Sequence, residues 1–210
     1  SCFENGDGVY SLSFSKKQLG REAVKAFSEL AEKYDIFGGY CPEPKHIYFS
    51  RTMSKTELTG IFCPFTMEAN VNIDIPDYSI GSTMCHELAH LKGFIREDEA
   101  NYVAYLACQA STNLELRYSG LMEALILSGN ALYAKDADLY YKARALYSDG
   151  VSRDLAANSL YWQEFKDKPV SNAAQKINDA YLKANNQEDG VQSYGRMVDL
   201  LLAQFRAEKK

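Results

Sequence analysis

The residues of this sequence that could do chemistry are two histidines four positions apart, His86 and His90, with Glu87 beside the first of them. On a helix, residues four apart project from one face, so both imidazoles can reach a single ion. A catalytic zinc site uses three protein ligands and leaves one position for water, which a nearby carboxylate can deprotonate. The spacing therefore predicts a zinc (Zn2+) site with His86 and His90 as ligands and Glu87 as general base.

The third ligand must come from the residues that follow. A third histidine could close the site three residues after Gly93, but Arg96 stands there, and arginine does not ligate zinc. Gly93 suits the left-handed end of a helix, so we expect the chain to turn there and a second helix to begin at Glu97. On that helix Glu97 and Asn101 share a face, whereas Glu99 points elsewhere.

This arrangement resembles the glutamate zincins (gluzincins), in which a glutamate ligand is followed four residues later by an aspartate or asparagine. The resemblance implies that Glu97 is the third zinc ligand, with Glu99 as the alternative, and that Asn101 orients a ligand histidine. Asparagine would orient the histidine but raise its basicity less than aspartate does. An acidic first turn, which the helix dipole stabilises, is the alternative explanation of residues 97–99.

A longer stretch is similar to a bacterial domain-of-unknown-function family of zincin-like proteins. The similarity is carried by Thr83 to Gly93 and by Arg96 to Asn101, and it covers most of the chain. Further matching segments are Gly60, Pro64 to Asn70, Tyr181 to Lys183 and Gly190 to Leu202. The resemblance implies a zinc metallopeptidase that acts on a peptide or protein. It also implies the soluble part of a membrane-anchored protein, because members resemble proteins with transmembrane helices ahead of the peptidase-like domain. The acidic, tyrosine-rich composition favours the extracytoplasmic side, which unpaired cysteines fit less well.

Two further parts of such a site can be sought in the sequence. The oxyanion of the attacked carbonyl needs a donor, and because no histidine follows His90 we expect a tyrosine or arginine, with Tyr194 and Arg196 as candidates. Zincins commonly bind the substrate as an added strand on a sheet edge, and residues 62–72 are the candidate edge because they directly precede the active-site helix. An ordinary edge strand is the alternative.

The elements that position these residues follow from hydrophobic periodicity. The spacing of Leu19, Val24, Phe27 and Leu30 predicts a helix from Lys16 to about Tyr34. Stretches rich in β-branched and aromatic residues predict a small sheet, and Pro64 indicates that one strand is an edge. The predicted strands are His46–Ser50, Gly60–Phe65 and Asn70–Ile75. From Asp77 onward the pattern is helical, with breaks at Gly93, Gly120, Gly150, Pro169 and Gly190.

The predicted fold class is therefore α+β, mostly α, and zincin-like, with a small N-terminal sheet, an active-site helix and a C-terminal helical lobe. A chain of 210 residues with 46% hydrophobic composition can form one domain with a substantial core. We expect residues 1–76 to form a helix and the sheet, 77–113 the active-site helices, and 114–210 the helical lobe. Ile80, Met84, Leu88 and Leu91 should pack into the core on the side of the helix away from the histidines.

Composition excludes several other classes of function. The net charge is -5 and the basic residues are scattered, which argues against a nucleic-acid partner. The five cysteines form no C-x-x-C pair, so neither a disulfide framework nor a cysteine zinc cluster is indicated, and Cys85 and Cys108 should be buried. The longest apolar stretch, Leu121–Leu132, is too short to cross a bilayer. We expect membrane association only through segments absent from this chain.

Two other interpretations remain at this point. The domain could be a catalytically silent zincin-fold module that senses or binds other parts of a membrane protein. A purely structural zinc site has no need of a general base such as Glu87, and it would be closed by a fourth ligand. The domain could also be a metal-free helical protein in which the histidine motif is a coincidence. His46, the third histidine, lies in a predicted strand and is expected to be structural.

Overall fold

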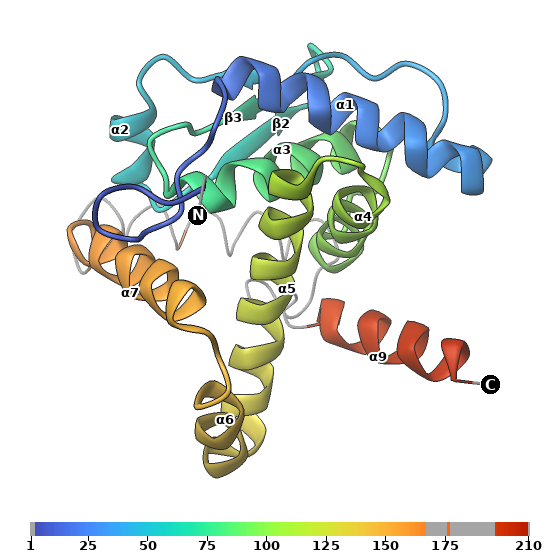
Figure 1. Cartoon of the computed structure of the whole chain (residues 1–210). Coiled ribbons are helices and arrows are strands. Elements are labelled where there is room, and N and C mark those ends of the chain that lie inside the picture. Colours follow the sequence, from blue (N-terminus) through green and yellow to red (C-terminus); the bar gives the residue numbers. More distant parts are fainter. Residues whose placement is uncertain (1–2, 167–175, 177–195, 210) are drawn as a thin grey trace.

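The structure is a computed structural model that describes residues 3–166, 176 and 196–209. Several helices and the small sheet gather around one end of the longest helix, which extends away from them (Figure 1). The predicted α+β, mostly α, class is confirmed. The elements are α1 (Lys16–Lys33), η1 (Asp35–Phe37), β1 (Lys45–His46), α2 (Ser50–Ser54), β2 (Gly60–Cys63), β3 (Glu68–Val71), α3 (Asp77–Leu91), α4 (Glu97–Ala110), α5 (Leu114–Lys135), α6 (Ala137–Arg144), α7 (Asp149–Gln163) and α9 (Met197–Glu208).

Helix α3 is the centre of the molecule. It packs against α1, α4, α5 and the strands β2 and β3. Eleven of its fifteen residues are buried, so a helix that carries polar side chains for chemistry is held rigidly from several sides. Ile80, Met84 and Leu88 are fully buried and Leu91 is buried, as predicted.

The sheet has three strands in the order β1-β3-β2. Strand β1 pairs parallel with β3, and β2 pairs antiparallel with β3, with Phe62 opposite Ala69. Strand β2 is therefore an edge, which confirms the expectation from Pro64, the residue that follows it.

All three predicted strands end earlier than expected: β2 ends at Cys63, before Pro64, and not at Phe65. The prediction that His46–Ser50 is a strand was wrong after His46, because Ser50 starts α2 and its hydroxyl accepts a hydrogen bond from Ile73 N at 2.9 Å. The prediction for 70–75 was wrong after Val71. There Asn72 is buried, its N–H donates to Thr59 O at 2.9 Å and its side-chain amide to Leu58 O at 3.0 Å, and the strand goes no further although the alternation of polar and apolar residues continues.

The predicted break at Gly120 was also wrong, because Gly120 lies inside α5. Its role is a close approach between helices. A Cβ at this position would overlap Cβ of Cys108 on α4 and lie 3.1 Å from its Sγ. The glycine therefore permits α4 and α5 to touch, and packing outweighs its poor helix propensity. Gly93 and Gly150 do lie at helix boundaries, and Pro169 and Gly190 lie outside the described residues.

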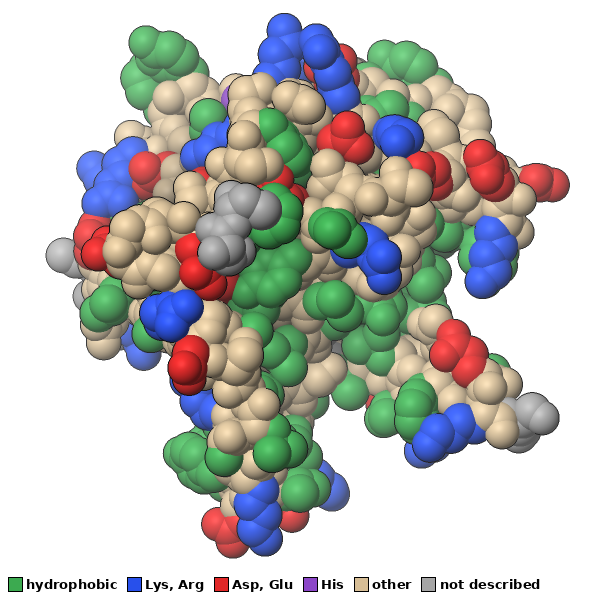
Figure 2. Space-filling view, in the orientation of Figure 1, with side chains coloured by type: hydrophobic (Ala, Val, Ile, Leu, Met, Phe, Trp, Pro, Cys, Tyr) green, Lys and Arg blue, Asp and Glu red, His purple; other side chains and the backbone are tan. Residues whose placement is uncertain are grey.

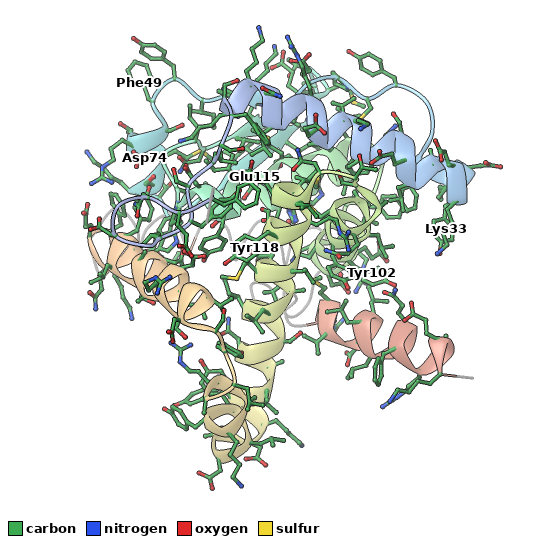
Figure 3. The ribbon with its side chains drawn as sticks, in the orientation of Figure 1. Lys33, Phe49, Asp74, Tyr102, Glu115 and Tyr118 are labelled. Atoms are coloured by element: carbon green, nitrogen blue, oxygen red, sulfur yellow. The ribbon has the colours of Figure 1, made fainter. Side chains whose placement is uncertain are left out.

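Buried carboxylates hold the N-terminal segment against the helical lobe. Glu115 on α5 accepts hydrogen bonds from the hydroxyl of Tyr10 at 2.8 Å and from Ser13 N at 3.0 Å. Asp154 on α7 accepts from Tyr10 N at 2.7 Å and from the hydroxyl of Tyr118, which Figure 3 labels together with Glu115. These contacts join the start of the chain to α5 and α7.

The surface and the cysteines agree with the composition. On the face in Figure 2, acidic and basic side chains are interspersed, without an extended region of one sign. The four described cysteines are free, and Cys85 and Cys108 are buried, as predicted, with a hydrogen bond between them. Among the described residues, no helix is long and apolar enough to span a membrane.

The close approach at Gly120 predicts a stability effect. Gly120→Ala should lower the free energy of unfolding by about 1–3 kcal/mol, because the added methyl group forces α4 and α5 apart. The matched control is Gly129→Ala in the same helix, where the nearest atom is the edge of the Tyr140 ring at 3.3 Å. It should be neutral or gain up to about 1 kcal/mol from helix propensity. Urea unfolding followed by circular dichroism measures both, and equal effects would contradict the interpretation.

Candidate metal centre

A tight turn after α3 brings the two parts of the candidate site together. Gly93 has a φ of +98°, which favours glycine, and its N–H donates to His90 O at 2.9 Å. The N–H of Phe94 donates to Ala89 O at 3.1 Å, and the Phe94 ring stacks on Phe37 at 5.5 Å. The chain thus leaves α3 at Gly93 as predicted, and α4 begins at Glu97 as predicted.

The turn places three potential ligands around one point. The carboxylate of Glu97 lies 3.2 Å from His86 Nε2 and 3.6 Å from His90 Nε2. One ligand atom from each of the three residues lies within 4.8 Å of the others. Zinc binds nitrogen and oxygen ligands at about 2.0–2.2 Å, so one ion fits among these atoms. His86, His90 and Glu97 are the only such group among the described residues.

Neighbouring groups orient both histidines. His90 Nδ1 lies 2.7 Å from the carbonyl oxygen of Phe94, so an Nδ1–H donated there leaves the Nε2 lone pair facing Glu97. The side chain of Asn101 hydrogen-bonds His86, and Asn101 lies on α4 one turn after Glu97. The structure therefore places Asn101 where the sequence predicted a residue that orients a ligand histidine.

The acidic residues next to Glu97 are directed elsewhere. Asp98 Oδ2 lies 3.0 Å from Arg96 Nη2, and the Glu99 carboxylate lies 3.6 Å from Arg96 Nε. The Glu99 side chain is 47% exposed. Of the two candidates for the third ligand, only Glu97 therefore joins the histidines.

Glu87 lies beside the cluster in a tightly packed position. It is only 4% exposed, and a Cβ on Gly60 of β2 would lie 2.7 Å from its Cδ. Its Oε2 is buried without a hydrogen-bond partner among the described residues, and so is Nδ2 of Asn101. Buried polar atoms are rarely left without a partner, so two such atoms around His86 indicate that a bound group is missing.

Burial and charge set the protonation of the cluster. Burial lowers the pKa of His86, but the hydrogen bond to Glu97 and the charges of Glu87 and Glu97 raise it to about 9. Burial, and then the positive charge of His86, lower the pKa of His90 to about 4, so this ring is neutral at pH 7. Burial raises the pKa of Glu87 to about 7, against the opposing charge of His86. These groups have the perturbed pKa values typical of functional sites.

The structure describes only some of the remaining predicted residues. Tyr194 lies outside the described residues, and Arg196 is an exposed residue at the start of α9. Phe62, on the candidate substrate edge, has its ring 6.3 Å from that of His90. The predicted edge therefore borders the cluster, and Arg196 is not part of the group of possible metal ligands.

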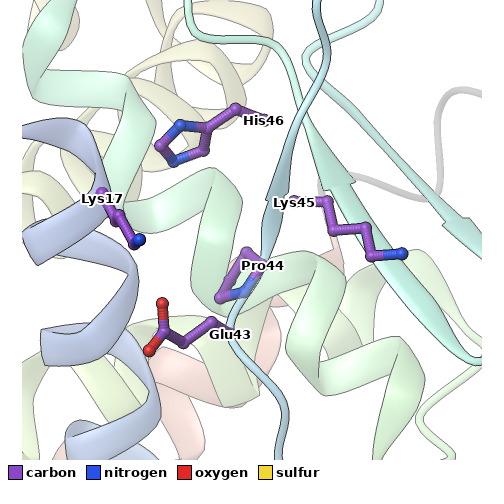
Figure 4. A pocket seen from close by; sticks show the side chains of 5 residues that line it. All are labelled: Lys17, Glu43, Pro44, Lys45 and His46. Atoms are coloured by element: carbon purple, nitrogen blue, oxygen red, sulfur yellow. The ribbon is translucent and has the colours of Figure 1, made fainter.

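His46 lies in a separate pocket between α1 and β1. Lys17, Glu43, Pro44 and Lys45 line this pocket with it (Figure 4). Burial is the largest influence on its pKa, which is lowered. His46 belongs to no group that could hold a metal among the described residues, in line with the expectation of a structural role.

Two residues at the site were not assigned a role from the sequence. Gly60 is required by the close approach of Glu87, which no local pattern shows. Burial raises the pKa of Glu123, on α5, and the positive charge of His86 opposes this to a smaller extent. A signal for Glu123 was available, because it is the one charged residue in the apolar stretch Leu121–Leu132.

A comparison with known proteins identifies the family. The family model described as "Protein of unknown function (DUF3810)" matches residues 5–202, so the chain belongs to the DUF3810 family. No curated protein and no solved structure matches the chain. The family description names no activity, so what the site does must be argued from its geometry.

From this cluster we predict that the protein binds one zinc ion per chain. Protein purified in zinc-supplemented medium should hold about one zinc ion per chain, and His86→Ala or Glu97→Ala should lose most of it, because two ligands remain. Glu99→Ala is the matched control on the same turn of α4 and should keep its zinc. Elemental analysis by mass spectrometry measures the metal. Equal zinc contents in all four proteins would rule the assignment out.

Zinc affinity should fall as the pH falls. The metal binds neutral imidazole. His86 has a pKa of about 9 and is protonated at neutral pH, so it must lose a proton when the metal binds. Below pH 9 the apparent Kd should therefore rise at least about tenfold for each unit of pH. Competition with a chromophoric chelator at several pH values measures this slope. A Kd that stays constant above about pH 7.5 would indicate an ordinary histidine pKa and contradict the prediction.

Proposed function

We propose that this member of the DUF3810 family is a zinc-dependent hydrolase of the zincin type that cleaves peptides or proteins. His86, His90 and Glu97 would hold the ion, and Glu87 would be the general base. The observation that carries the proposal is the meeting of these three ligands beside a buried carboxylate whose Oε2 has no partner among the described residues. A structural metal site would need only the ligands.

The residues of the site have separate tasks in this proposal. Zinc, when bound, would polarise the substrate carbonyl and lower the pKa of a water molecule. Glu87 would take the proton of that water and pass it to the leaving amine, and its buried position beside the ligands supports this role. Asn101 and the Phe94 carbonyl would hold the histidine rings in place.

The ligand set favours catalysis over a structural role. Structural zinc sites are closed by four protein ligands, whereas catalytic sites keep one position open. The group found among the described residues has three members, and the nearest thiol on α3, Cys85, is buried and hydrogen-bonded to Cys108. The catalytically silent module considered from the sequence would leave the buried Glu87 carboxylate without a function.

A peptide substrate is supported by the sheet edge beside the site. Strand β2 has β3 on one side only, so the N–H and C=O groups on its other side could pair with an extended peptide. Phe62 of this strand lies next to His90 and the β2 backbone at Gly60 lies against Glu87. A peptide held along β2 would therefore pass close to the ligands and the base.

The proposal also assigns this domain to a membrane-anchored protein, on the extracytoplasmic side. Its support is the resemblance of the segments around residues 83–101 to a family whose members resemble proteins with transmembrane helices. The anchor would lie in segments outside this chain.

The general base gives the sharpest test. Glu87→Gln should bind zinc as the wild type does and lose at least about 99% of its hydrolysis of a fluorescent casein or a quenched-peptide library, because an amide cannot accept the proton. Glu99→Gln, an exposed glutamate on the neighbouring helix, is the control and should keep both properties. Wild-type turnover by zinc-loaded Glu87→Gln would overturn the role of Glu87. Zinc binding without hydrolysis by the wild type would favour the silent module.

A further inference from the structure

The hairpin formed by β2 and β3 exposes large apolar side chains beside the candidate metal centre. Ile61 on β2 is 46% exposed, and Phe65 and Met67, in the turn between the two strands, are 96% and 47% exposed. Single apolar side chains are common on protein surfaces, whereas several on one short element are typical of a surface that binds something.

The hairpin carries no unbalanced charge. Glu68 is the one charged residue between Gly60 and Val71, and it forms an ion pair with Lys45 of β1. An apolar surface of this kind favours apolar side chains, because both partners lose contact with water. It gives a charged side chain nothing in return for the water that it would lose. The ligand that fits this surface is therefore apolar and uncharged.

The two faces of β2 are directed to different surroundings. Side chains alternate along a strand, and residues opposite each other on paired strands share a face. Phe62 is opposite the buried Ala69, and its ring lies 6.3 Å from that of His90, so this face is directed to α3. Ile61 therefore lies on the other face, which is open to solvent. One face of β2 borders the candidate metal centre, and the other offers an apolar contact.

The free edge of β2 determines which apolar ligand fits. In the described part of the chain β2 pairs only with β3, so the N–H and C=O groups on its outer side are open to a partner. An extended peptide can pair with these groups, whereas a lipid chain cannot. A peptide residue beside Ile61 would place its side chain on the same face, with about 5 Å between the Cβ atoms. A peptide that continues past Cys63 would reach the turn that carries Phe65 and Met67.

We propose that the β2–β3 hairpin selects extended, uncharged peptide segments with large apolar residues, as an unfolded protein chain exposes them. Ile61, Phe65 and Met67 would determine this specificity. The inference rests on the proposed function, because the bound segment would be the substrate. Peptide residues level with Phe62 would face the metal ligands, and those level with Ile61 would pack on its side chain.

Binding can be measured separately from cleavage with the Glu87→Gln chain purified in zinc-supplemented medium. The probes are two fluorescent peptides of equal length, in which leucine or serine alternates with threonine and arginine at both ends ensures solubility. Fluorescence anisotropy should show that the leucine peptide binds at least about tenfold more tightly. Methylation of its backbone nitrogens should abolish binding, because pairing with the edge requires these donors.

Substitutions on the hairpin test the assigned residues. Phe65→Ser and Met67→Gly, each added to the Glu87→Gln chain, should weaken binding of the leucine peptide about tenfold and leave the serine peptide unchanged. Met67 has a φ of +54°, so glycine relieves backbone strain there and a loss of binding does not reflect a damaged fold. Leu146→Ser is the matched control, because it removes a side chain that is 86% exposed between α6 and α7. It should change neither affinity.

Turnover by the zinc-loaded wild type separates this inference from the proposed function. The leucine peptide should be cleaved with a kcat/KM at least about tenfold above that of the serine peptide. Equal binding and cleavage of both peptides, or a preference that survives in Phe65→Ser and Met67→Gly, overturns the inference and leaves the proposed function standing. Preferential binding without cleavage supports the apolar docking surface and overturns the proposed function.

Two further outcomes complete the test. If Phe65→Ser or Met67→Gly does not fold, Ile61→Thr, which keeps a β-branched residue in the strand, must weaken binding of the leucine peptide. Binding of the wild type but not of Phe65→Ser to phosphatidylcholine vesicles, without a preference between the peptides, assigns the hairpin to a lipid surface and overturns the inference.

Discussion

The reversal of the chain at Gly93 is the constraint on which the candidate metal centre depends. Two histidines on α3 can face one point, but only a tight turn brings Glu97 of α4 back to them within 3.2 and 3.6 Å. The same turn exposes the carbonyl of Phe94 to His90 Nδ1, so the backbone that delivers the third ligand also fixes the second. Burial of α3 on several sides makes this geometry rigid.

Charge concentration is the second organising feature of the site. Glu87, Glu97 and Glu123 all influence, or are influenced by, His86, and the described part of the chain supplies no lysine or arginine ion pair to the first or third of them. Burial raises the pKa of Glu87, and the negative charge of Glu97 adds a smaller effect in the same direction. A bound cation would relieve this repulsion, so the electrostatics and the coordination geometry favour the same occupant.

The sequence was most informative where function and local structure depend on short spacings. The four-residue interval of His86 and His90, the turn at Gly93 and the helix start at Glu97 follow from local backbone rules and agree with the structure. The strand ends were predicted wrongly because they depend on contacts with residues distant in the sequence, such as the bond from the Asn72 side chain to Leu58 O. The same holds for Gly120, which faces a neighbouring helix, since no local pattern reports a contact between helices.

The short edge of the sheet limits pairing between copies of this protein. An unpaired strand edge is a template for pairing with other chains, and long edges of this kind promote aggregation. Strand β2 offers only the four residues Gly60–Cys63, and Pro64, which has no N–H, interrupts any continued ladder. A short segment can therefore pair beside the candidate metal centre, while two copies of the chain find too little backbone there to form a stable joint sheet.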